Sequence, residues 1–201
     1  MNDVKQIVFA SSSVVYGKAE IPTPEEAPIA PISNYGAAKV ASEFYVSTYS
    51  KLYGMKATVL RYANVIGPRL THGVIYDFYH KLKKNPKVLE ILGDGNQKKS
   101  YFHVVDAVDA TLVAAQKTKK WSVFNVGSEE TITVKKISHL VVSTLGLEGV
   151  RYEYTGGKTG WLGDVPVMLL SIEKIKSLGW KPKFCIEESI LDTIDWLKAH
   201  F

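Results

Sequence analysis

The pattern of apolar and polar positions over the first 65 residues predicts a strand, a helix and a second strand. Residues 6–10 (QIVFA) form a short apolar run that is typical of a buried strand. Helical periodicity begins at residues 33–34, either of which can act as the N-cap, and continues to about Tyr53, where Gly54 stops it. Residues 56–61 (KATVLR) predict the next strand. Two strands joined by such a helix form a crossover that favours a parallel sheet.

The rest of the chain mixes short strands with helices. Helical periodicity occurs over five segments: 74–84, 104–117, 134–145, 171–178 and 186–199. Residues 121–126 predict a strand, and residues 150–154 fit a further one. Alternation around Gly93-Asp94-Gly95-Asn96 predicts a hairpin over residues 88–104. We therefore expect an α/β fold with a small α+β lobe after about residue 65.

Composition narrows the class of protein. A chain of 201 residues, 46% of them apolar, is expected to form one globular domain or a domain and a half. It contains no apolar run long enough to cross a bilayer, so we expect no membrane partner. The single cysteine, Cys185, excludes an intrachain disulfide framework and fits a reducing cytosol, so we expect a cytoplasmic protein. The five histidines lack the short spacings that hold zinc, and we predict no metal site.

The net charge of +5 comes mainly from loosely grouped lysines. Such groups can attract an anionic partner, but they are more often solvated helix ends and loops. Nucleic-acid modules usually interleave aromatic residues or Gly/Arg with the basic positions, and that pattern is absent here. We expect no nucleic-acid partner.

Tyr35 and Lys39 are four residues apart on the first predicted helix, so their side chains share one face. An ammonium group held near a phenol favours the phenolate form, which helps a tyrosine to exchange protons near neutral pH. The spacing alone favours an ordinary surface pair, because a tyrosine and a lysine four residues apart often occur by chance. The context favours chemistry, because the preceding strand ends in the hydroxyl-rich segment SSSVVYG at residues 11–17. Small residues at 36–38 would let another molecule approach closely.

The ordered set SSSVVYG, YGAAK, RYANVIGPR, GDGNQKKSYFHVVD and GWLGDVPVMLL resembles the extended short-chain dehydrogenase/reductase family. Within it, the chain resembles the NAD-dependent sugar-nucleotide epimerases of the UDP-glucose 4-epimerase type. The resemblance covers nearly the whole chain. It implies an α/β fold in which a partial Rossmann-like parallel sheet, the C-terminal half of that domain, adjoins a small α+β substrate lobe. Residues 1–65 would belong to the NAD-binding domain and 66–201 would contain the substrate lobe, with 102–127 returning to the Rossmann-like part.

The resemblance also assigns site residues. Ser12, Tyr35 and Lys39 would be catalytic, with Tyr35 as the acid–base. Cofactor binding would involve Ala10, Ser11, Tyr35, Lys39 and Tyr62. Substrate binding would involve Ser12, Ser13, Tyr35, Asn64, Gly73, Val74 and Lys99. We expect His103 and Asp106 to organise the start of the helix at 104–117, with Asp106 as its cap, rather than to contact ligand.

The chemistry implied by the resemblance is 4-epimerisation of a UDP-sugar of the UDP-glucose/UDP-galactose type through a 4-keto intermediate, with NAD as the expected cofactor. Sugar-nucleotide 4,6-dehydratases carry an acidic pair at the strand end. Ser13 and Val14 occupy those two positions here, and valine cannot replace a carboxylate in proton transfer. A 4-reductase or a decarboxylase of the same superfamily remains open.

Departures from the family pattern keep a second hypothesis open. No glycine-rich turn that could seat the NAD diphosphate opens a helix in this sequence, so NAD binding by this chain alone is in question. Lys99 stands where the family usually has arginine, which loses the two-pronged contact with phosphate. The chain could therefore be a truncated, non-catalytic module that binds a sugar nucleotide or a protein. A sheet without its leading strands would also expose an edge, so we expect a homodimer or other self-association.

Overall fold

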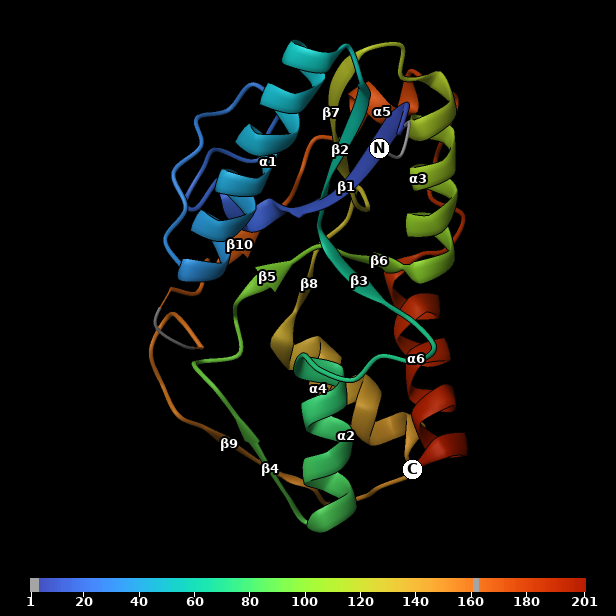
Figure 1. Cartoon of the computed structure of the whole chain (residues 1–201). Helices are drawn as coiled ribbons and strands as arrows, with labels where there is room; N and C mark the ends of the chain where they lie inside the picture. Colours follow the sequence, from blue (N-terminus) through green and yellow to red (C-terminus); the bar gives the residue numbers. More distant parts are fainter. Residues whose placement is uncertain (1–3, 161–162) are drawn as a thin grey trace.

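A three-stranded parallel sheet forms the upper part of the molecule in the computed structural model, which describes residues 4–160 and 163–201 (Figure 1). Its strands are β1 (Gln6–Ser12), β2 (Lys56–Tyr62) and β7 (Trp121–Val126), in the order β1-β2-β7. β1 and β2 run in register over their whole length, from Gln6 opposite Lys56 to Ser12 opposite Tyr62. The expected parallel arrangement of the first two strands is confirmed.

Two helices pack against this sheet. The helix α1 (Asn34–Tyr53) contacts β1 and β2, whereas α3 (Val104–Lys117) contacts β2 and β7. The sheet runs between them in Figure 1. Ser33 caps α1 by accepting a hydrogen bond from the amide of Gly36 at 3.1 Å, and Gly54 ends the helix with φ of 66°. A positive φ of this size suits glycine, which explains why the helix ends there.

The lower part of the molecule is built from three helices around an apolar core: α2 (Val74–Lys84), α4 (Val134–Thr144) and α6 (Ile186–His200). Side chains with less than 2% exposure meet there, among them Ile75, Ile137 and Ile190. The strands β4 (Val88–Ile91) and β9 (Arg151–Tyr154) pair in parallel beside these helices. The short helix α5 (Glu173–Lys176), within the predicted segment 171–178, contacts β7.

The hairpin predicted over residues 88–104 is wrong. Gly93 and Gly95 have φ of 80° and 76° and do turn the chain, but the strands on either side join different sheets. β4 pairs with β9, and β5 (Lys98–Lys99) lies between β10 (Val167–Met168) and β8 (Ile132–Thr133). β6 (Tyr101–His103) pairs with β3 (Asn64–Ile66). Long-range pairing therefore overrides the local turn signal.

The cap predicted at Asp106 is also wrong, because His103 caps α3. The ring of His103 accepts a hydrogen bond from the amide of Val105 through Nδ1 at 3.2 Å. Asp106 lies within the first turn and is fully buried, and its carboxylate accepts from the amides of Lys183 and Phe184. It thus ties α3 to the segment that leads into α6.

Candidate functional site

A cavity of about 800 Å³ lies between the carboxyl ends of the sheet strands and the lower helices. Residues from widely separated parts of the chain line it, including these positions singled out from the sequence: Ala10, Ser11, Ser12, Tyr35, Lys39, Tyr62, Asn64, Gly73, Val74 and Lys99. Ser13 is the exception, because it is 8% exposed in the turn Ser13–Val15 and does not line the cavity. The fold therefore brings together most of the residues that the motifs pointed to.

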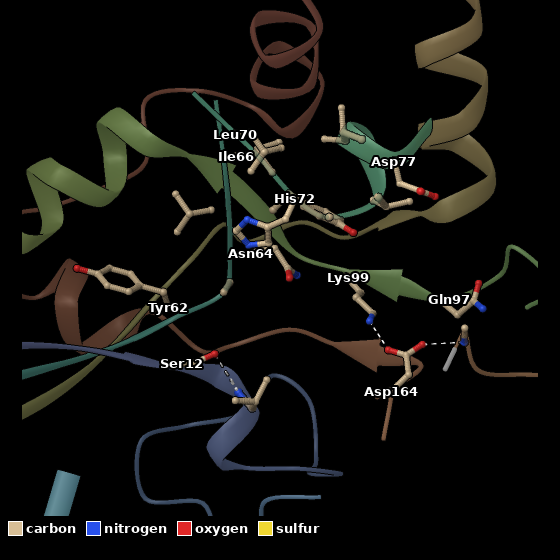
Figure 2. Close-up of a pocket in the computed structure, with 18 of the residues that line it drawn as sticks. Ser12, Tyr62, Asn64, Ile66, Leu70, His72, Asp77, Gln97, Lys99 and Asp164 are labelled. Carbon is tan, nitrogen blue, oxygen red and sulfur yellow. Dashed lines mark hydrogen bonds and ion pairs between the residues drawn. The ribbon is translucent and has the colours of Figure 1, made fainter. Parts of the chain in front are cut away.

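Ser12, Tyr35 and Lys39 form one end of the cavity, here called the strand-end group. Lys39 donates a hydrogen bond from Nζ to the carbonyl oxygen of Ala10 at 2.7 Å, and Nζ lies 5.5 Å from the centre of the Tyr35 ring. Tyr35 is 57% exposed at the first turn of α1. The hydroxyl of Ser12 accepts from the amide of Val14 at 3.5 Å (Figure 2). A phenol, an ammonium and a hydroxyl around one opening can bind an alcohol and move its proton.

Two charged residues behind this group were missed by sequence reasoning. The carboxylate of Glu43 on α1 and the guanidinium of Arg61 on β2 form a buried ion pair at 2.6 Å, with side chains 5% exposed on each partner. Burial lowers the pKa of Arg61, but hydrogen bonds to Glu43 and Tyr16 outweigh it, so the net pKa is raised and the cation is retained. Ser11 also donates its hydroxyl to Glu43, at 2.5 Å. An arginine that directly follows the apolar residues Val59 and Leu60 in a buried strand is the sequence signal that could have predicted such a partner.

The opposite end of the cavity, here called the anion end, consists of the N-terminus of α2 and the ion pair Lys99–Asp164. Gly73 precedes α2 with φ of 92° and provides no side-chain cap. Both it and Val74 line the cavity, so the positive end of the helix dipole is available there. Lys99 pairs with the buried carboxylate of Asp164, which also accepts from the amide of Gly160 at 2.9 Å. Figure 2 shows this pair facing the same opening as Ser12.

An unpaired acceptor lies beside that ion pair. Gln97 is 3% exposed and lines the cavity, and its Oε1 atom has no hydrogen-bond partner among the described residues. Its Nε2 donates to the carbonyl of Leu92 at 3.2 Å. Sequence reasoning missed both Gln97 and Asp164. A helix N-terminus, a lysine and a buried amide together suit an oxygen-rich anion that also carries a hydrogen-bond donor.

Tyr62 ends β2 opposite Ser12 and Asn64 begins β3, and each has a partner within the protein. The hydroxyl of Tyr62 bonds Thr111 Oγ1 at 2.6 Å, and its ring is directed away from Lys99 in Figure 2. Burial raises the pKa of Tyr62, although the bond to Thr111 opposes this, so the phenol stays neutral. Asn64 donates from Nδ2 to the carbonyl of Ser100 at 2.9 Å, which supplies the partner that a polar residue among apolar neighbours requires.

Comparison with known proteins assigns the fold and the family. A family model described as "NAD dependent epimerase/dehydratase family" matches residues 1–127. The chain belongs to this family. A putative UDP-glucose 4-epimerase of Methanocaldococcus jannaschii is 36% identical to this epimerase-family chain over 202 residues, which cover 98% of the chain and 64% of the relative.

Solved structures agree with that assignment. The crystal structure of a UDP-galactose 4-epimerase superimposes on this family member with a TM-score of 0.89 and 44% identity, covering 98% of this chain and 64% of that one. The UDP-glucose 4-epimerase of Thermotoga maritima with UDP-glucose gives a TM-score of 0.88 and 34% identity, with coverages of 98% and 64%. The Thermus thermophilus UDP-glucose 4-epimerase complex with NAD gives 0.83 and 31%, with coverages of 98% and 65%. The Rossmann-like α/β fold is thus confirmed.

The epimerase-family chain spans about two thirds of the length of the relatives it matches. Lys39 lines the cavity and uses one of its three N–H donors on the carbonyl of Ala10, which leaves donors of the kind that the hydroxyl groups of a dinucleotide cofactor require. Among the residues that the structure describes, no glycine-rich turn links a strand to a helix in the way that would seat the diphosphate. Two residues of the C-terminal motif, Trp161 and Leu162, lie outside the described residues.

Residues 4–160 and 163–201 contain neither a metal-ligating cluster nor a helix that could span a membrane. No group of three or more His, Cys, Asp or Glu side chains in these ranges could hold a metal ion. No helix in the same ranges is both long enough and apolar enough to span a membrane.

Proposed function

We propose that this chain carries the reacting and substrate-binding part of a UDP-sugar 4-epimerase acting on the UDP-glucose/UDP-galactose pair. The observation that carries the proposal is the cavity itself, which has Ser12, Tyr35 and Lys39 at one end and Lys99 with the α2 N-terminus at the other. A sugar nucleotide has a reactive alcohol at one end and an anionic diphosphate in its middle. The two ends of the cavity match those two demands.

In this proposal Tyr35 takes the proton of the sugar C4 hydroxyl. Tyr35 returns a proton to the same oxygen after the 4-keto sugar has rotated within the site. Ser12 hydrogen-bonds the same oxygen while charge develops on it. Lys39 stabilises the phenolate form of Tyr35. NAD, when bound, would supply the hydride acceptor and donor that oxidation and reduction at C4 of the sugar require. Its nicotinamide end would be held by Ala10, Ser11, Lys39 and Tyr62, whose positions at the ends of β1, α1 and β2 support the assignment.

The anion end would hold the diphosphate and the sugar. The amides at Gly73 and Val74 open the first turn of an 11-residue helix, whose dipole favours anions. Lys99 would exchange its pairing with Asp164 for a phosphate oxygen, and Asn64 would contact the sugar or the diphosphate. Residues 1–65 and 102–127 would then form the cofactor side of the site, and the rest of 66–201 the substrate side.

The departures noted in the sequence favour a second candidate, a non-catalytic module that binds sugar nucleotides or a partner protein. Lys99 is already neutralised by Asp164, and the described residues lack a seat for the NAD diphosphate. Binding of a UDP-sugar without turnover would follow from an intact anion end beside an incomplete cofactor site.

One experiment separates the two candidates. The purified chain is denatured and assayed for released NAD, and the native chain is titrated with NAD and with UDP by calorimetry. Interconversion of UDP-glucose and UDP-galactose is then measured with added NAD. Turnover supports the epimerase. UDP binding with neither NAD binding nor turnover supports the sugar-nucleotide binding module. If the chain does not bind UDP, both the epimerase and the sugar-nucleotide module are rejected, and only the protein-binding form of the second candidate is left.

We also propose that the chain self-associates through the edge of β1. Among the described strands, β1 pairs only with β2, so its other edge is free to bond another chain. Val8 on this strand is 39% exposed. Light scattering over a range of concentrations tests the idea. A Val8→Lys variant should reduce the associated fraction, and a wild-type chain that stays monomeric at every concentration rejects the proposal.

A further inference from the structure

The buried ion pair behind the strand-end group makes contacts on both sides of the α1–β1 interface. Arg61 donates from Nη2 to Glu43 Oε2 at 2.6 Å and from Nε to Glu43 Oε1 at 3.0 Å, a two-pronged geometry that fixes orientation as well as distance. Arg61 lies opposite Ser11 in the β1–β2 register. Ser11 donates to the same carboxylate oxygen, Oε1, so α1, β1 and β2 meet at one side chain.

The spacing along α1 connects this junction to the strand-end group. Glu43 is one helical turn beyond Lys39 and two turns beyond Tyr35, so all three side chains lie on one face of α1. Ser11 immediately precedes Ser12 on β1. A shift of α1 along β1 would therefore move Tyr35 and Lys39 relative to Ser12, and would also break the contacts of Glu43.

The junction is held from its far side as well. Arg61 Nη1 donates to the hydroxyl of Tyr16 at 2.8 Å, and that hydroxyl donates to Asn125 Oδ1 at 2.8 Å. Asn125 is fully buried on β7 and donates from Nδ2 to the carbonyl of Thr23. Arg61 thus cannot follow a displaced Glu43 without breaking a chain of hydrogen bonds that extends across the sheet.

We propose that Glu43 is a positioning residue that sets the register of α1 against β1 through Arg61 and Ser11. Glu43 does not line the cavity, so it acts on Tyr35 and Lys39 only through the helix. The inference rests on the proposed function for its catalytic meaning. The positioning itself is a property of the fold and can be measured without turnover.

The test uses the chain itself, labelled with ¹³C-lysine and observed by NMR. Lys39 Nζ lies 5.1 Å from the centre of the Phe9 ring and 5.5 Å from that of Tyr35, so its ε-methylene resonance carries ring-current shifts. The resonance is assigned with Lys39→Arg. In Glu43→Gln the neutral amide cannot balance the charge of Arg61, and its NH₂ group faces hydrogen-bond donors of Arg61 or Ser11. We therefore expect the Lys39 resonance to move to the position of an exposed lysine.

Two further variants keep the test decisive. Ser11→Ala keeps the ion pair and removes only its link to β1, so we expect a smaller movement in the same direction, and this variant decides the matter if Glu43→Gln does not fold. Ile190→Val loosens the core of the lower helices, where Ile190 is fully buried, and should leave the resonance in place. An unchanged resonance in Ser11→Ala and in any folded Glu43→Gln overturns the proposal. An equal movement in Ile190→Val, which would reflect general loosening, also overturns it.

Turnover gives an independent reading. If wild type is active, a misplaced Tyr35 should lower kcat by about 100-fold in Glu43→Gln and change KM by less than about threefold. If KM changes as much as kcat, the catalytic part of the inference fails. If wild type is inactive, the proposed function fails, and the NMR result still decides the positioning role.

Discussion

The two ends of the cavity are built in opposite ways. Behind the strand-end group lies a fully satisfied ion pair between side chains 5% exposed, connected to three strands of a continuous sheet. The anion end is held by strands of only two residues, β5, β8 and β10, and by the pair Lys99–Asp164, whose lysine side chain is 22% exposed. The strand-end group is thus held rigidly by buried hydrogen bonds, whereas the anion end offers a partly exposed charge.

This difference matches the demands of the two tasks. Proton transfer depends on the position of a phenol to within a fraction of an ångström, so its supports need to be rigid. Binding of a diphosphate depends mainly on charge and on amide donors, and a lysine on a short strand can adjust to it. We therefore expect changes at the strand end to act on turnover and stability, and changes at the anion end to act on affinity.

The largest effect is expected from Tyr35→Phe. Removing the phenolic proton should lower kcat by a factor of about 100 to about 10,000, while the dissociation constant for UDP changes little, since general acid–base groups contribute on that scale. Steady-state kinetics with added NAD and calorimetry with UDP provide the measurements. Tyr45→Phe is the matched control, because Tyr45 lies on the same helix and is 72% exposed. If Tyr35→Phe retains turnover, Tyr35 is not the acid–base group.

The next effect concerns stability at the braced end. Arg61→Met leaves the Glu43 carboxylate buried without its cation, which should lower the free energy of unfolding by about 3–5 kcal/mol. Urea denaturation followed by circular dichroism measures it. Lys176→Met breaks the more exposed pairs with Glu129 and Glu173 and should cost less than about 1 kcal/mol. Equal losses in the two variants would contradict the contrast between the two kinds of ion pair.

A smaller effect is expected on affinity at the anion end. Lys99→Met should weaken UDP binding about tenfold, on the scale of one charge-assisted hydrogen bond. Asp164→Asn keeps an acceptor for the amide of Gly160 but releases Lys99, so it should tighten binding by a few-fold. Calorimetry at two salt concentrations measures both. If the two variants change affinity in the same direction, the pair does not control access to Lys99.

The smallest effect is a difference in alkaline stability between the two ends. Burial and the nearby carboxylate of Asp164 raise the pKa of Tyr101, which lies at the anion end. Burial also raises the pKa of Tyr16, but Arg61 opposes that rise. A phenol whose pKa is higher in the folded state keeps its proton longer than the unfolded chain does. The free energy of unfolding should therefore fall above about pH 10, by up to about 1.4 kcal/mol per pH unit for each such group.

Urea unfolding between about pH 9 and about pH 11 checks this difference. Tyr101→Phe should reduce the fall in the free energy of unfolding with rising pH more than Tyr16→Phe does. The reason is that Arg61 opposes the rise in the pKa of Tyr16, whereas Tyr101 has no such opposing cation among the described residues. A larger effect from Tyr16→Phe would show that Arg61 does not protect the phenol at the braced end.

Most helices and the main strands could be predicted from the sequence because their signals are local. Ser33 and Gly54 bound α1 as their cap chemistry requires, and α2 spans Val74–Lys84 as the periodicity indicates. The failures occurred where local signals compete with distant partners. Gly93 and Gly95 do form a turn, but the strand partners of β4 and β5 lie about 33 to 69 residues away in the sequence, which no local pattern encodes.

The same division applies to the candidate site. The sequence alone determined that Tyr35 and Lys39 share a helix face and follow a strand ending in hydroxyl groups, because helix geometry fixes the relation between residues four apart. Only the tertiary structure decided that Arg61 pairs with Glu43 and Lys99 with Asp164. A charged residue within an apolar segment of the sequence indicates that a partner is needed, because an unpaired charge is costly once it is buried. Which residue becomes that partner depends on how distant elements pack, and a local sequence pattern does not contain that information.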